Sequence, residues 1–457
     1  MKKILNLFKK NKTLITLALP IFLELFFQFL IGVIDSIQIS FDQDAVSAIN
    51  QTNAVINVIN LVFAVLGTAS IILITQFKGI KDEKNVNKIY CLSFYFNLIV
   101  GIIISFILVF GAKTIFNLMG VEERYIDKAV IYMQINGCFS FVIALTTVFS
   151  SFLRSNKLMI QSTIVTGIMN IMNVGGNALA LFVFNSGIQG VAISSVISRI
   201  VGLIVIVIMY IHYIHSSLSI KNIFPFPGKL FATLLKIGLP SAGESLSYNL
   251  SQLVIIMILN YHFILSQSID VNIRGYIANF TSIVYMFSNA IAQSAQVIIG
   301  PKIAKNEIDD TFHIVKDTVK MSGIITVLCS LIFIAISYPL LNSLLNIKDP
   351  ELKSQAMNIV LIVCAIDILL EFGRSGNIPY VRCLQTVGDI YTPVFFAIIC
   401  CWSVAVLGSY ILSAFCNLGV IGVWISCALD ENIRNIIFTF RWNSKKWTKF
   451  NLIKNIN

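Results

Sequence analysis

Long apolar runs separated by short polar segments dominate this chain. Each run is long enough, as a helix, to cross a hydrocarbon core of about 30 Å. The pattern therefore predicts an all-α integral membrane protein with twelve transmembrane helices. The runs cover residues 13–40, 49–77, 88–110, 126–152, 158–184, 188–213, 231–261, 274–300, 315–340, 352–378, 389–413 and 419–440.

Polar residues inside the first two runs gather on one helix face. Glu24, Gln28, Asp35 and Gln38 project within a stripe roughly 80° wide at 100° per residue. Asn57 belongs to a similar stripe of asparagines in the second run. A carboxylate at the membrane centre costs about 2.5 to 3.5 kcal/mol on insertion scales, so such groups line a cavity or pair with a partner. We expect these two helices to wall a polar cavity.

The two halves of the chain repeat each other. Leu19, Pro20 and Glu24 reappear 220 residues later in the segment that holds Glu244. Six spans in each half bring the second half into the membrane from the same side as the first, so the repeats are parallel. The predicted parts are two pseudo-symmetric six-helix bundles at 1–213 and 231–440, a cytoplasmic linker at 214–230 and a basic cytoplasmic tail at 441–457.

The charges indicate how the chain is oriented in the membrane. The chain has 33 Lys and Arg residues against 22 Asp and Glu, although only 12% of its residues are charged and 57% are hydrophobic. Most of the basic residues fall in segments that are cytoplasmic if the N-terminus is inside. We therefore expect a multi-pass protein of the bacterial inner (plasma) membrane with both termini in the cytoplasm. The net charge of +11 then reflects topology and contact with an anionic leaflet of the lipid bilayer, not nucleic-acid binding.

The second half carries most of the acidic residues within the spans. Asp367, Glu371 and Arg374 lie at i, i+4 and i+7 on one face. We expect Arg374 to pair with Glu371, which leaves Asp367 less compensated, and we expect a similar local pairing around Arg434. Acids outnumber arginines within the spans, so the lumen should favour cations. Gln293 belongs to a polar stripe that continues this wall.

Several segments resemble the multidrug and toxic compound extrusion (MATE) family over nearly the whole chain. They are LALP and GVIDS in the first run, FLRSNK and CLQTVGD at two paired turns, and GIQGVAISSVIS in the sixth run. EFGR and DENIR resemble a Gram-positive bacterial branch in particular. The resemblance implies an antiporter, not an enzyme: an organic cation leaves while Na⁺ or H⁺ enters, and two lobes rock about a central cavity. No Walker A sequence is present to bind ATP, and no cofactor or metal site is expected.

The resemblance also implies a coupling-ion site in the first lobe. Asp35, Asn173, Asn177 and Ser195 occupy the matching positions. Two of them depart from the family pattern, because Asn177 replaces an Asp and Ser195 replaces a Thr. Loss of one carboxylate weakens a Na⁺ site, so coupling to H⁺ through Asp35 is the preferred interpretation. We expect a monomer that binds small organic cations, with cavity residues Glu24, Gln28, Asn57, Glu244, Gln293, Asp367, Glu371 and Arg374.

Two other functions are compatible with a polytopic membrane protein. One is a lipid-linked oligosaccharide flippase of the same superfamily, whose phosphate-bearing cargo calls for a basic lumen. The acidic excess here argues against it. The other is an integral membrane enzyme acting on lipids, which would need clustered His or acidic metal ligands at an interface, and the sequence shows no such cluster.

Overall fold

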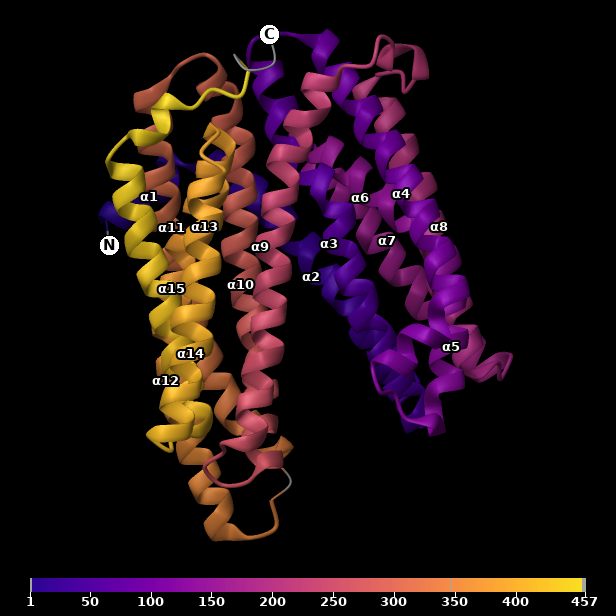
Figure 1. The fold of residues 1–457 in the computed structure, drawn as a ribbon, viewed down its shortest axis with the longest axis vertical. Coiled ribbons are helices and arrows are strands. Elements are labelled where there is room, and N and C mark those ends of the chain that lie inside the picture. Colours follow the sequence, from indigo (N-terminus) through magenta and orange to yellow (C-terminus); the bar gives the residue numbers. More distant parts are fainter. Residues whose placement is uncertain (1, 346, 454–457) are drawn as a thin grey trace. The chain divides into compact units, whose positions relative to one another are not determined.

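The computed structural model describes residues 2–345 and 347–453, and every regular element in these two ranges is a helix (Figure 1). The α-helices are α1 (Lys2–Lys10), α2 (Lys12–Gln38), α3 (Gln43–Gly79), α4 (Glu83–Leu118), α5 (Glu123–Cys138), α6 (Ser140–Ser155), α7 (Met159–Ala178), α8 (Gly187–Ile214), α9 (Gly228–Tyr261), α10 (Gln267–Ala304), α11 (Ile308–Leu344), α12 (Pro350–Val387), α13 (Tyr391–Cys400), α14 (Leu407–Tyr410) and α15 (Gly419–Asn443). Short π-helical turns are η1 (Leu179–Val183), η3 (Cys401–Val406) and η4 (Ile411–Phe415), and 3₁₀ turns are η2 (Ile220–Ile223) and η5 (Lys446–Lys449).

The all-helical membrane architecture is confirmed, with a smaller number of apolar spans than the twelve predicted. Among the described residues, ten helices are long and apolar enough to cross a membrane. Helices α5 and α6 meet at a 50° bend and together provide an eleventh. The twelfth predicted run corresponds to α15, which carries Asp430, Glu431 and Arg434 near its middle and is too rich in charge to count by composition alone.

Local sequence signals explain where several of these helices begin. Asp42, Asp82 and Asp349 each accept a hydrogen bond from a backbone N–H in the first turn of α3, α4 and α12, at 3.0, 3.1 and 3.0 Å respectively. An aspartate side chain in this position satisfies one of the N–H groups that a helix leaves without an internal partner. These three residues therefore fix the entry of the chain into three long spans.

Contacts between residues divide the chain into two compact units at equivalent points of the repeat. We call Leu23–Ala242 the N-terminal unit, and the residues up to Phe22 together with those from Gly243 onward the C-terminal unit. Both boundaries fall within a helix, α2 or α9, two residues after Pro20 or Pro240. They are 220 residues apart, which is the spacing that the sequence repeat predicts.

Backbone conformation repeats between the halves as well. Lys81 and Asn306 both adopt positive φ, at 61° and 64°, in the turns after α3 and α10. Asn185 and Asn417 do so at 49° and 52°, after η1 and η4. The π-helical turns η1 and η4 also begin 232 residues apart. The same irregularities at constant offsets support the predicted parallel repeat.

Each unit has its own apolar core. In the N-terminal unit, Ile49 of α3, Leu108 of α4 and Val191 of α8 belong to one buried cluster. In the C-terminal unit, Val360 of α12 and Val423 of α15 belong to another. These cores hold the helices that carry the polar side chains described below.

The segment predicted as a linker, 214–230, is mostly outside α-helices. It runs from the end of α8 through η2 to the start of α9 at Gly228. Tyr95 of α4 donates a hydrogen bond to the carbonyl oxygen of Leu218 at 3.0 Å, and Ser216 donates to Asn87 at 2.7 Å. The segment is therefore packed against α4 within the N-terminal unit.

The region predicted as a basic tail, 441–457, is folded as far as the description extends, and its residues 454–457 lie outside the described ranges. Helix α15 continues to Asn443, and Trp442 and Trp447 stack with ring centroids 4.5 Å apart. Arg441 pairs with Asp389 at 2.7 Å. These contacts fix the end of α15 against the turn that follows α12.

Candidate functional site

The N-terminal unit holds a buried carboxylate that is bound by neutral donors. Asp35 of α2 is 1% exposed. Its Oδ1 accepts from Asn177 of α7 at 2.7 Å, and its Oδ2 accepts from Tyr132 of α5 and Ser195 of α8, both at 3.0 Å. Four helices thus converge on one carboxylate, which is in contact with hydroxyl and amide groups.

A second layer of amides surrounds this carboxylate. Asn173 donates to the Ser195 hydroxyl at 3.0 Å, and Asn177 also donates to Gln38 at 2.9 Å. The side-chain oxygens Oδ1 of Asn173 and Asn177 are buried and have no hydrogen-bond partner within the described ranges. The four residues predicted as the coupling-ion site, Asp35, Asn173, Asn177 and Ser195, therefore lie together in one hydrogen-bonded cluster.

The other acidic residue of α2 has a different environment. Glu24 is 1% exposed and forms an ion pair with Arg154 of α6, with a distance of 2.6 Å from Nη2 to Oε1. Ser150 and Ser162 donate to the same oxygen at 2.7 and 2.8 Å. These contacts link α2 to α6 and α7 within the N-terminal unit. The predicted role of Glu24 in receiving cargo stays a prediction.

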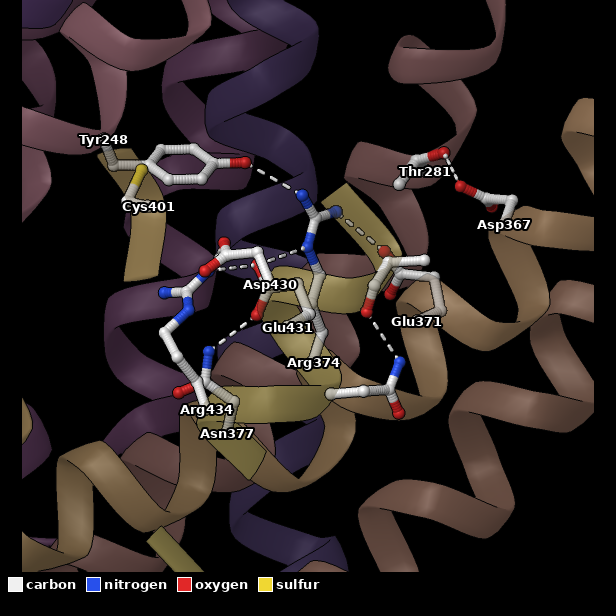
Figure 2. A network of polar contacts seen from close by, with 12 residues as sticks. Tyr248, Thr281, Asp367, Glu371, Arg374, Asn377, Cys401, Asp430, Glu431 and Arg434 are labelled. Carbon is white, nitrogen blue, oxygen red and sulfur yellow. Dashed lines mark hydrogen bonds and ion pairs between the residues drawn. The ribbon is translucent and has the colours of Figure 1, made fainter. Parts of the chain in front are cut away.

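The C-terminal unit contains a larger cluster of charged side chains between α12 and α15 (Figure 2). Arg374 pairs with Glu371 at 2.7 Å, as predicted, and also with Glu431 of α15 at 3.2 Å. Arg434 pairs with Asp430 at 2.5 Å, which confirms the predicted local pair, and with Glu431 at 3.0 Å. Glu431 therefore joins two ion pairs that the sequence had suggested were separate.

Asp367 is the acid in this cluster without a cationic partner at salt-bridge distance in the described structure. Its Oδ1 accepts from Thr281 of α10 and from the indole N–H of Trp424, each at 3.0 Å. Its Oδ2 is buried without a hydrogen-bond partner among the described residues. The sequence-based expectation that Asp367 is less compensated than Glu371 is confirmed.

Two glycines explain how α12 and α15 approach closely enough for these ion pairs. A Cβ on Gly373 would lie 2.8 Å from the backbone N of Asn432 and from the carbonyl carbon of Glu431. A Cβ on Gly376 would overlap the Asn435 side chain. Real Cβ atoms do not approach backbone this closely, so glycine is required at position 373. The stretch EFGRSG thus supplies both the charges and the close contact that brings them together.

The comparison with known proteins decides the family. The MatE family profile matches two segments, residues 20–179 and 240–411, which together make up most of the chain. This chain belongs to the MATE family. It is therefore a multi-pass membrane transporter, as predicted, and the two matched segments start at Pro20 and Pro240, the equivalent positions of the repeat.

Relatives of this MATE protein match it over nearly its full length. The Bacillus subtilis (strain 168) protein named "Uncharacterized transporter YisQ" is 30% identical and covers 96% of this chain and 95% of its own. The "Probable multidrug resistance protein YoeA" of the same organism is 22% identical over 84% of this chain and 83% of its own. A solved structure titled as the outward-facing conformation of a multidrug resistance MATE family transporter of the MOP superfamily has a TM-score of 0.84. It is 18% identical and covers 95% of this chain and 96% of its own, so it supports the fold.

The remaining predicted cavity residues of the MATE protein do not belong to these two clusters. Gln28 and Asn57 are exposed on α2 and α3, while Glu244 of α9 and Gln293 of α10 are partly buried. No measurement tests their role as a cargo site, so it stays a prediction.

Sequence reasoning missed several members of the two clusters. Tyr132, Tyr248 and Trp424 each supply a polar tip to a buried acid or arginine. An aromatic residue in an apolar run looks like an ordinary core residue, so the only available signal was its hydrogen-bonding group, which usually needs a partner when buried.

Proposed function

We propose that this MATE protein is a secondary active antiporter that exports organic cations in exchange for H⁺. In this proposal Asp35 takes up and releases the coupling proton. The observation that carries it is the burial of the Asp35 carboxylate among three neutral donors. Cationic cargo is supported by the excess of acids over arginines in the C-terminal cluster, and export of drugs by the printed name of the relative YoeA.

The hydrogen bonds around Asp35 suggest how a proton acts there. An ionised Asp35 can accept all three bonds that the structure contains. A proton on Oδ1 turns that atom into a donor, so the Asn177 amide must turn and present its oxygen, which is otherwise unpaired among the described residues. The Asn177 N–H then no longer bonds Asp35, and the contact between α2 and α7 changes. Two protonation states with two packings are what coupling between proton and cargo requires.

Na⁺ is the second candidate for the coupling ion. The unpaired oxygens of Asn173 and Asn177 lie beside a carboxylate, and hard cations prefer oxygen ligands of this kind. With a single carboxylate, we expect such a site to bind Na⁺ weakly.

Transport in proteoliposomes with separately imposed pH and Na⁺ gradients distinguishes the two ions. We expect ethidium export to follow the pH gradient and to be lost in Asp35→Asn, because the amide cannot exchange a proton. Asp44→Asn is the matched control, since Asp44 is part of an exposed ion pair with Arg124. Full proton-driven export by a correctly inserted Asp35→Asn protein would overturn the proposal. Export that follows only the Na⁺ gradient would favour the second candidate.

We also propose a monomer in the bacterial plasma membrane with both termini in the cytoplasm, and a cargo path that includes Glu244, Gln293 and Asp367. The distribution of basic residues supports this orientation. Asn222→Cys, in the predicted linker, should react with a membrane-impermeant thiol reagent only when the cytoplasmic side is open to it. Labelling from outside alone would contradict this topology.

A further inference from the structure

The guanidinium group of Arg374 lies in a site that has the features of an organic-cation binding site (Figure 2). Its Nη1 donates to Glu371 at 2.7 Å, its Nε to Glu431 at 3.2 Å and its Nη2 to the Tyr248 hydroxyl at 2.8 Å. The guanidinium carbon is also 5.7 Å from the centre of the Tyr285 ring. Two carboxylates, a phenol and an aromatic face are the groups with which proteins hold a planar cation.

The cluster around Arg374 has more acceptors than its own arginines use. Asp367, Glu371, Asp430 and Glu431 outnumber Arg374 and Arg434. Three of these acids keep an oxygen that is buried and unpaired in the described structure, and each of the three is at most 2% exposed. The unpaired atoms are Asp367 Oδ2, Glu371 Oε2 and Asp430 Oδ1. A buried acceptor without a donor is costly, so these oxygens favour a ligand that brings several N–H groups.

We propose that Arg374 is a tethered stand-in for a guanidinium- or amidinium-type cation, which competes with it for Glu371, Glu431 and Tyr248. The inference rests on the proposed export of organic cations and names the class of cargo that this site takes. Arg374 keeps 13% of its side chain exposed while Glu371 has none, so the guanidinium covers the carboxylate that the ligand must reach.

The geometry favours this class of cation over others. A quaternary ammonium group has no N–H donors and would leave the Glu371 and Glu431 oxygens unsatisfied. A planar cation with N–H groups in its plane can bond two carboxylates and still present its face to Tyr285. The chain's own arginine already makes these contacts, so the site is built for that shape.

Calorimetric titration of the purified protein with phenylguanidine, and with phenyltrimethylammonium as a probe of equal charge without N–H donors, tests the proposal. Wild-type protein should bind phenylguanidine more tightly than phenyltrimethylammonium. Arg374→Lys keeps the positive charge but loses the planar fork, so it competes less well. We expect it to bind phenylguanidine roughly tenfold more tightly than wild type, because one charge-assisted hydrogen bond is worth about that factor. Its affinity for phenyltrimethylammonium should not change.

Arg274→Lys is the matched control, because Arg274 lies in the same unit and bonds Gln252 at 3.0 Å. It should leave both affinities at the wild-type value. Equal gains for the two probes in Arg374→Lys, or no gain for phenylguanidine, would overturn the inference. The wild-type preference requires no variant, so a loss of both probes' discrimination there would overturn it as well. Titration uses no ion gradient, so binding as expected without export would contradict the proposed function and leave this inference standing.

Discussion

Asn177 donates a hydrogen bond of 2.7 Å to Asp35 through its amide nitrogen, while its own amide oxygen has no partner among the described residues. The contact joins α2 to α7 across the N-terminal unit. Because only one of the two side chains is acidic, the pair is a single carboxylate with an amide beside it. The identity of residue 177 therefore decides how much negative charge the site holds.

Replacing Asn177 with aspartate should move the protein towards Na⁺ coupling. Two carboxylates at this separation cannot both ionise without a proton or a cation between them. We expect Asn177→Asp to gain Na⁺-dependent thermal stability and Na⁺-driven export that wild type lacks. Asn170→Asp is the control, because Asn170 lies on the same helix but donates to the Phe27 carbonyl instead. An equal response to Na⁺ in both variants would contradict this explanation.

Removing Arg154 should destabilise the N-terminal unit strongly. Arg154→Met leaves the Glu24 carboxylate buried with two serine donors and no positive charge. Breaking a buried ion pair in this way costs about 3 to 5 kcal/mol of unfolding free energy. The double variant Glu24→Gln with Arg154→Met should recover much of that loss, since it leaves no unpaired charge.

Thermal or denaturant unfolding of the purified variants measures this effect. Arg124→Met is the control, because Arg124 is 70% exposed in its ion pair with Asp44, and exposed pairs contribute about 1 kcal/mol or less. If Arg154→Met and Arg124→Met lower stability equally, Glu24 does not depend on Arg154.

The sequence predicted the parts of the fold that depend on period and length. Apolar runs, the 220-residue repeat between Pro20 and Pro240, and the local pair of Glu371 and Arg374 all follow from spacing along one chain segment. The link from Arg374 to Glu431 could not be predicted, because it depends on the close approach of two helices 57 residues apart in sequence. Arg154 was missed for a related reason: it lies near the end of its run, where a basic residue is typical of a cytoplasmic boundary.

The turn between α2 and α3 should lose stability in acid. Lys128 donates to both carboxylate oxygens of Asp42, at 2.8 and 2.7 Å, and this contact, with the helix-capping bond from Ala45, holds the pKa of Asp42 below its ordinary value. A carboxyl whose folded-state pKa is depressed stabilises the fold above its unfolded pKa of about 3.9, and the benefit is lost as pH falls through the folded value.

Stability measured from pH 6 down to pH 3 therefore tests the Lys128 contact. We expect the difference in melting temperature between wild type and Lys128→Met to shrink as the pH drops below about 4. Asp42→Asn keeps a residue that can cap α3, so it should remove the acid dependence without removing the cap. A difference that is constant over this pH range would show that Lys128 does not act through the Asp42 charge.

Adding a single methyl group at Gly373 should disrupt the charged cluster of the C-terminal unit without changing any charge. The new Cβ would lie 2.8 Å from backbone atoms of α15, so α12 and α15 must separate. Overpacking of this kind costs about 1 to 3 kcal/mol, and separation lengthens the contact of Arg374 with Glu431, which is already 3.2 Å. Gly275→Ala is the control, because nothing lies within 4 Å of the Cβ it would add and alanine favours the helix. We therefore expect Gly373→Ala to lower both the melting temperature and the selectivity among cationic substrates in export assays, and Gly275→Ala to keep both. Unchanged selectivity in a measurably destabilised Gly373→Ala protein would separate the cluster from cargo recognition and assign it to packing.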